Sequence, residues 1–120
     1  PVPLIGPSRF VAPGLAMDDL PPIDFVLISH NHYDHLDLPT LRSLAECNPA
    51  PVFYVPLGNG ALLQQQGIAY VEELDWGQTH AYKGVTIHCL PAQHWGKRSL
   101  TDDRKVLWSS WAVICAIQRF

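Results

Sequence analysis

The 120-residue sequence has little charge, few cysteines and no long apolar run. Charged residues make up 16% of the chain, against roughly 25% in typical globular proteins, while 48% of the residues are hydrophobic. This composition excludes an intrinsically disordered segment, because disorder requires low hydrophobicity and high charge. The formal net charge of −3 gives no sign of the basic surface that nucleic-acid binding requires. We therefore expect a folded domain with no nucleic-acid partner.

Signals for membrane insertion and for disulfide formation are also missing from the sequence. The uncharged run at 106–117 is shorter than the roughly twenty apolar residues of a membrane-spanning helix. Cys47, Cys89 and Cys115 are widely spaced and contain no C-x-x-C pair, which argues against a thiolate metal site or a disulfide framework. We expect reduced thiols and a cytoplasmic location, with peripheral membrane contact left open.

Alternating apolar runs and turn residues predict a single α/β domain. Runs of apolar and β-branched residues predict strands, and helical spacing predicts two short helices. The expected order is a strand at 23–28, a helix at 39–47, a strand at 52–55, a helix at 61–67, a strand at 68–74, a hairpin of 79–82 and 85–90, and a strand at 106–116. Such an order begins as α/β and ends antiparallel, so we expect a mixed sheet with helices packed on it.

Four potential metal ligands fall within six consecutive residues, in the pattern His30-x-His32-x-Asp34-His35. Chance produces this pattern in roughly one of a thousand sequences of the same composition. Because residues two apart point the same way in extended backbone, His30 and His32 can converge on one cation. Asp34 and His35 follow where the chain turns toward the predicted helix, and they can face a second cation. Imidazole and carboxylate donors suit zinc, and also iron or manganese.

A third histidine is needed to complete the first cation site, and His94 is the best candidate. It lies in a loop directly after a predicted strand, as His30 does, and open α/β sheets bind ligands at the carboxyl ends of their strands. His80 and His88 lie within predicted strands, and we interpret both as ordinary strand histidines. Two loops distant in the sequence are therefore expected to meet at one metal.

Three segments of the sequence resemble the metallo-β-lactamase superfamily. They are residues 28–37 (ISHNHYDHLD), residues 91–95 (PAQHW) followed by Lys97 and Arg98, and residues 107–111 (LWSSW). The first contains the superfamily's metal-binding pattern. All three in this order resemble the branch of N-acylphosphatidylethanolamine-hydrolysing phospholipase D and its bacterial, RomA-like relatives. The resemblance runs from about residue 7 to residue 113 and implies the first half of an αββα sandwich.

This resemblance implies a site with two zinc ions. The first would be held by His30, His32 and His94, and the second by Asp34 and His35. Asp34 would also be catalytic, orienting a metal-bound hydroxide that attacks a phosphodiester. The implied substrate is a phospholipid of the N-acylphosphatidylethanolamine type, cleaved to an N-acylethanolamine and a phosphatidic acid.

Basic residues beside the His94 loop are candidates for contact with the substrate phosphate. Lys97 and Arg98 flank this loop and carry the positive charge that such contact needs. The alternative is that they belong to a solvated hairpin with acidic neighbours. The sequence leaves both interpretations open.

The family also has ligands that this sequence does not contain. Its bridging aspartate and last histidine follow the strand with Trp108 and Trp111, whereas the sequence ends at Phe120. Asp102 and Asp103 precede that strand, so neither is the bridging residue. We therefore expect a domain at 1–120 that is truncated before its C-terminal half, little activity of this chain by itself, and self-association through an uncovered sheet face.

Two other functions stay open at this point. One is a lactonase or another hydrolase of the same superfamily, which would use the same metal ligands with different pocket walls. The other is a non-catalytic half-domain that binds metal weakly. An assay of a phosphodiester against a lactone, together with metal analysis, separates the three.

Overall fold

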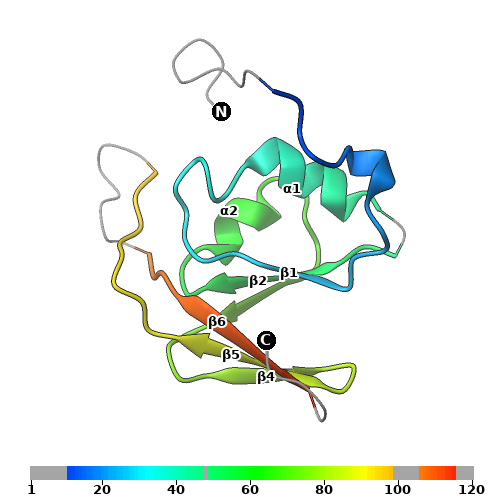
Figure 1. The fold of residues 1–120 in the computed structure, drawn as a ribbon. Helices are drawn as coiled ribbons and strands as arrows, with labels where there is room; N and C mark the ends of the chain where they lie inside the picture. The colour runs from blue at the N-terminus through cyan, green and yellow to red at the C-terminus, as the bar shows by residue number, and fades with distance from the viewer. Residues whose placement is uncertain (1–10, 48, 99–105, 116–120) are drawn as a thin grey trace.

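The computed structural model describes residues 11–47, 49–98 and 106–115, which form a layer of helices and two layers of sheet (Figure 1). The elements, in chain order, are η1 (Met17–Asp19), β1 (Phe25–Leu27), α1 (Leu38–Ala45), β2 (Val52–Pro56), α2 (Gly60–Gln64), β3 (Val71–Leu74), β4 (Thr79–Tyr82), β5 (Val85–Leu90) and β6 (Ser110–Cys115). This order of strands and helices agrees with the order expected from the sequence.

The strands form two stacked sheets rather than one mixed sheet. One sheet is parallel, in the order β1-β2-β3, and the other is antiparallel, in the order β4-β5-β6. The chain leaves the first sheet through a turn at Gly77, whose φ of +85° favours glycine and whose N–H donates to the carbonyl of Cys89 at 2.8 Å. The α/β class is confirmed, but β3 and β4 do not pair, since this turn places β4 beneath the parallel sheet.

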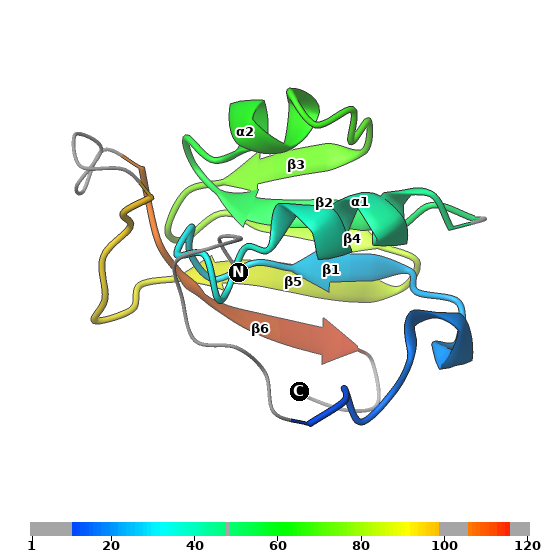
Figure 2. The same ribbon diagram turned by 90° about the horizontal axis from the view of Figure 1, so that it is seen from above.

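The parallel sheet is buried on both faces, and β2 lies at its centre. Phe53 and Val55 point toward the helices, where they pack with Ile28, Leu36, Leu41, Leu63 and Ile68. Tyr54 points the opposite way, into a second cluster with Leu74, Ile87 and Cys89. Seen from the helix side, α1 and α2 lie over this sheet (Figure 2). A continuous apolar run is what a strand covered on both faces requires.

Local sequence signals explain where the helices begin and end. Asp37 precedes α1 and accepts a hydrogen bond from the N–H of Thr40 at 3.2 Å, and Pro39 fits the first turn, where its missing N–H costs nothing. Gly67, with a φ of +81°, ends the turn after α2, and the N–H of Ile68 returns to the carbonyl of Leu63 at 3.3 Å.

The last strand is shorter than the predicted strand at 106–116. The N–H of Leu107 donates to the carbonyl of Leu57 at 2.9 Å, and the N–H of Ser109 donates to the carbonyl of Ser29 at 2.8 Å. These residues therefore bond to loops that follow the parallel strands, and pairing with β5 begins only at Ser110. Residue 116 lies outside the described residues. Within the described ranges, no helix has the length and apolar character to cross a membrane.

Candidate metal centre

The two histidine loops meet at one end of the molecule, where β1 and β5 both end (Figure 1). In the first loop, the N–H groups of His35 and Leu36 both donate to the carbonyl of His32, at 3.0 and 2.8 Å, which curls the chain. Leu36 is fully buried against α1 and the parallel sheet, so it anchors this curl in the core. The histidines before it are thereby directed toward the second loop.

His30, His32 and His94 converge as the sequence predicts. One ring nitrogen from each lies within 4.8 Å of the other two. Nε2 of His30 and Nε2 of His94 are 2.9 Å apart, although 64 residues separate them in the chain. Three imidazoles around one point are the protein ligands of a common type of catalytic zinc site.

The geometry of these histidines and the protonation of His30 fit a bound metal ion. Nε2–zinc bonds of 2.0–2.1 Å at a tetrahedral centre separate two nitrogens by about 3.3 Å, so His30 and His94 need only a small movement. Burial and the rings of His94, His35 and His32 lower the pKa of His30 to about 4, while Asp34 acts in the opposite direction. The His30 ring is therefore neutral at pH 7, which metal coordination requires.

The hydroxyl of Ser29 supports His30 from the other side of its ring. Ser29 Oγ lies 2.9 Å from Nδ1 of His30. A proton on Nδ1 that is shared with Ser29 leaves the Nε2 lone pair directed at His94. This role of Ser29 was not predicted from the sequence, where a hydroxyl residue directly before a candidate ligand is the signal that would have indicated it.

Asp34 and His35 lie beside the histidine cluster but remain exposed. Asp34 Oδ2 and His35 Nε2 are 3.5 Å apart, and their side chains are 80% and 52% exposed. The His35 ring centroid lies 4.2 Å from that of His30. No third donor joins this pair among the residues that the structure describes. The predicted second cation thus has two adjacent candidate ligands in this chain, and its binding stays a prediction.

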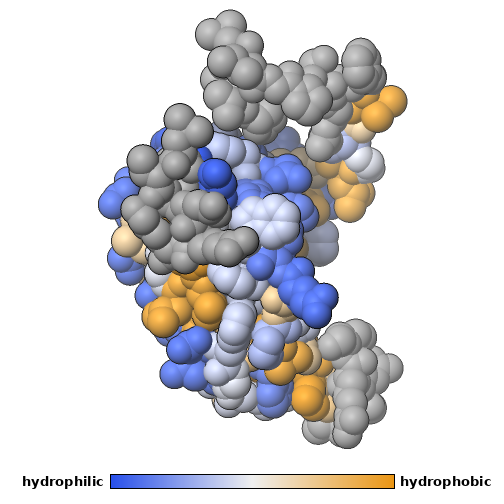
Figure 3. Space-filling model, turned by 90° about the vertical axis from the view of Figure 1, so that its left-hand side faces the viewer, coloured by the Kyte–Doolittle hydropathy of each residue, from blue (hydrophilic) through white to orange (hydrophobic). Residues whose placement is uncertain are grey.

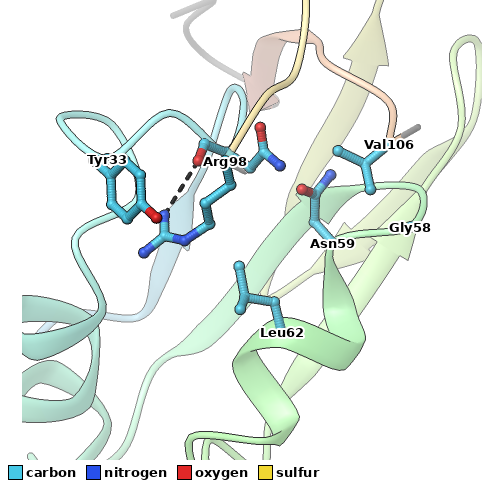
Figure 4. Close-up of a pocket in the computed structure, with 7 residues that line it drawn as sticks. Tyr33, Gly58, Asn59, Leu62, Arg98 and Val106 are labelled. Atoms are coloured by element: carbon cyan, nitrogen blue, oxygen red, sulfur yellow. Dashed lines mark hydrogen bonds between the residues drawn. The ribbon is translucent and has the colours of Figure 1, made fainter. Parts of the chain in front are cut away.

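Arg98 contacts the first histidine loop rather than pointing away from the protein. Its Nη1 donates to the carbonyls of Asn31, at 3.1 Å, and Leu36, at 2.8 Å, and its guanidinium lies 4.3 Å from the centroid of the Tyr33 ring. Figure 4 shows Arg98 and Tyr33 on one side of a pocket of about 300 Å³, across from Asn59. Arg98 therefore connects the start of the curled loop, at Asn31, with its end, at Leu36. The predicted contact of Arg98 and Lys97 with a substrate phosphate stays a prediction.

Replacing Arg98 by Met is expected to lower the free energy of unfolding of the metal-free protein by about 2 kcal/mol. The change leaves two carbonyls without their charged donor, in a loop whose Asn31 is buried. The matched Lys97→Met variant is expected to stay within about 0.5 kcal/mol of the wild type. Urea denaturation measures both, and equal stabilities of the two variants would contradict the role given to Arg98.

The chain is similar to proteins of a known superfamily. The family model described as "Beta-lactamase superfamily domain" matches residues 1–119. An N-acyl-phosphatidylethanolamine-hydrolyzing phospholipase D 1 from Caenorhabditis elegans is 43% identical over 96% of this chain and 35% of its own length. An uncharacterized protein of Mycobacterium tuberculosis is 41% identical over 95% of this chain and 31% of its own length. The mitochondrial N-acyl-phosphatidylethanolamine-hydrolyzing phospholipase D of Saccharomyces cerevisiae is 36% identical over 88% of this chain and 23% of its own length.

A solved structure shares the fold at lower identity. CmlA, a diiron beta-hydroxylase from Streptomyces venezuelae, superposes with a TM-score of 0.67 over 86% of this chain and 20% of its own, at 23% sequence identity. This likeness concerns the fold alone. The chain spans about a third or less of the length of the curated relatives it matches. The match to the family model shows that the chain belongs to the metallo-β-lactamase superfamily.

Proposed function

We propose that the protein is a zinc-dependent phosphodiesterase that cleaves phospholipids of the N-acylphosphatidylethanolamine type. The observation that carries this proposal is the convergence of His30, His32 and His94 from two loops. Relatives in a nematode and in yeast are named as phospholipases D acting on this substrate. The activity is proposed for the whole protein, since Asp34 and His35 find no third donor among the described residues.

Each residue of the site has a definable task in such a reaction. His30, His32 and His94 would hold a zinc ion, which would supply a nucleophile from water at neutral pH and offset negative charge on the phosphate. The exposed Asp34 carboxylate accepts a hydrogen bond from the attacking water and takes its proton. As the new P–O bond forms, the P–O bond to the ethanolamine oxygen breaks, and that oxygen takes a proton from solvent while Asp34 releases its proton to solvent. The products are an N-acylethanolamine and a phosphatidic acid.

We further propose that the rim of the site contacts a lipid surface. Tyr33, Leu57 and Trp95 are 47%, 48% and 47% exposed, and they follow β1, β2 and β5 at the end that carries the histidines. Figure 3 shows the surface at this end of the molecule. Outside the grey atoms, hydrophobic areas of this surface lie beside hydrophilic ones. The Trp95 ring also lies 4.9 Å from that of His94. Amphipathic aromatic side chains suit the interface between water and lipid.

Self-association through the outer face of the β4-β5-β6 sheet is a separate proposal. No described helix covers this face (Figure 1), and Leu90 and Ile114 are each 37% exposed. Light scattering at micromolar concentration is expected to give twice the monomer mass, and a stable monomer would refute the proposal. Zinc as the native metal, the RomA-like subgroup and the cytoplasmic location stay predictions.

The activity is tested on the zinc-loaded protein, both as the 120-residue chain and at the full length of its gene. With N-acylphosphatidylethanolamine in mixed micelles, we expect the full-length form to release N-acylethanolamine and phosphatidic acid, identified by mass spectrometry. Asp34→Asn should lower the rate at least about a hundredfold, while the control Asp18→Asn should leave it unchanged. Hydrolysis of a lactone without hydrolysis of the phospholipid would contradict the proposed substrate.

A further inference from the structure

We propose that the segment at residues 107–111 is a positioning element that sets the distance between the two histidine loops. The inference rests on the proposed metal site and goes beyond it, because it assigns Trp108 and Trp111 a role in metal affinity. Neither residue is a candidate ligand. Both lie in a segment that donates hydrogen bonds to each of the two loops.

The first histidine loop is bound to this segment just before His30. The indole N–H of Trp111 donates to the carbonyl of Ile28 at 3.0 Å. The backbone N–H of Ser109 donates to the carbonyl of Ser29 at 2.8 Å. The two residues that precede His30 are therefore both held by one short stretch of chain.

The second histidine loop is bound to the same segment just before His94. The indole N–H of Trp108 donates to the carbonyl of Ala92 at 2.8 Å. The hydroxyl of Ser110 donates to the carbonyl of Pro91 at 3.2 Å. Donors from adjacent residues, Trp108 and Ser109, thus bond to opposite loops, and this fixes the two loops relative to each other.

The segment has its own attachment to the core, so it does not simply move with the loops. The N–H of Leu107 donates to the carbonyl of Leu57, and the buried side chain of Asn59 donates to the carbonyl of Leu107 at 3.0 Å. At its other end the segment continues into β6, which pairs with β5 from Ser110 onward. The segment is therefore held by contacts outside the two loops, and its hydrogen bonds to the loops set the positions of both.

Metal affinity depends on such placement because ligands that are already close lose little freedom on binding. His30 and His94 have Nε2 atoms 2.9 Å apart, close to the separation that a shared zinc ion needs. Loss of an indole donor removes a hydrogen bond to the carbonyl of Ile28 or Ala92, two residues before a ligand in each case. Supporting contacts of this kind typically change metal affinity by about 10–100-fold.

The test compares two Trp→Phe variants and one Tyr→Phe variant, each of which removes one hydrogen-bonding group and keeps an aromatic ring. Trp108→Phe and Trp111→Phe each break a bond to a histidine loop. Tyr54→Phe is the control, because the partner of the Tyr54 hydroxyl, Nδ1 of His80 at 2.6 Å, lies in β4 and belongs neither to a histidine loop nor to this segment. Zinc affinity is measured by competition with a chromophoric chelator, and the visible spectrum of the cobalt(II) form reports the coordination geometry. Thermal unfolding of the metal-free proteins shows that each variant is folded.

We expect Trp108→Phe and Trp111→Phe each to weaken zinc binding about tenfold and to alter the cobalt spectrum, with Tyr54→Phe within twofold of the wild type and spectrally unchanged. Wild-type affinity and spectrum in both loop variants would overturn the inference while leaving the metal site intact. An equal loss in Tyr54→Phe would overturn it too, since the effect would then follow general stability. Failure of the wild-type protein to bind zinc would instead refute the proposed function.

Discussion

Replacing His94 by Ala is expected to weaken zinc binding at least about a hundredfold. Its Nε2 lies 2.9 Å from Nε2 of His30, and it is the one member of the cluster that the second loop contributes. Removal of a supporting residue costs about 10–100-fold in metal affinity, and removal of a ligand costs at least as much. Isothermal titration calorimetry with zinc measures the change directly.

His88→Ala is the matched control for this experiment. His88 lies in β5 and pairs with Ala112 of β6, on the strand that leads to the His94 loop. It lies outside the cluster of candidate ligands. We expect its zinc affinity to equal that of the wild type. A wild-type affinity in His94→Ala, or an equal loss in His88→Ala, would contradict the assignment of His94 as a ligand.

Replacing Phe53 by Ala is expected to have the largest effect on stability, about 3–5 kcal/mol. Phe53 is fully buried at the centre of the parallel sheet, where it packs with Leu36, Leu41 and Leu63 under the helices. The smaller side chain leaves a cavity that surrounding elements cannot fully close. The loss is a large share of the 5–15 kcal/mol that typically stabilises a domain. Urea denaturation followed by circular dichroism measures it.

Tyr70→Ala serves as the comparison for Phe53→Ala. Tyr70 is also aromatic, but its side chain is 60% exposed just before β3. The expected change in the free energy of unfolding is below about 1 kcal/mol. If the two variants were equally stable, the cluster around Phe53 would not be the main core of the domain.

The cluster of candidate ligands could be predicted from the sequence because short sequence patterns indicate it. The pattern from His30 to His35 and the position of His94 after a strand are both properties of short segments. The hydrogen bonds of Arg98 to the first histidine loop could not be predicted from the sequence. Their acceptors are the backbone carbonyls of Asn31 and Leu36, and every residue has such a carbonyl. The same holds for Trp108, whose partner is the carbonyl of Ala92.

The elements were predicted more closely than their assembly. Both arms of the hairpin, Thr79–Tyr82 and Val85–Leu90, have the predicted bounds, since alternation and the Lys83-Gly84 turn define them locally. The division into two sheets depends on contacts distant in sequence, such as the hydrogen bond of 2.6 Å between the Tyr54 hydroxyl and Nδ1 of His80. That hydrogen bond joins the facing sheets and gives Nδ1 of His80 a partner. This agrees with the interpretation of His80 as an ordinary strand histidine.

The most direct test of the metal centre is a crystal structure of the zinc-loaded protein, with the ion located by anomalous scattering. We expect one zinc ion bonded to ring nitrogens of His30, His32 and His94 at about 2.0–2.1 Å. A zinc ion bound elsewhere, with the His94 ring turned away from His30, would contradict it.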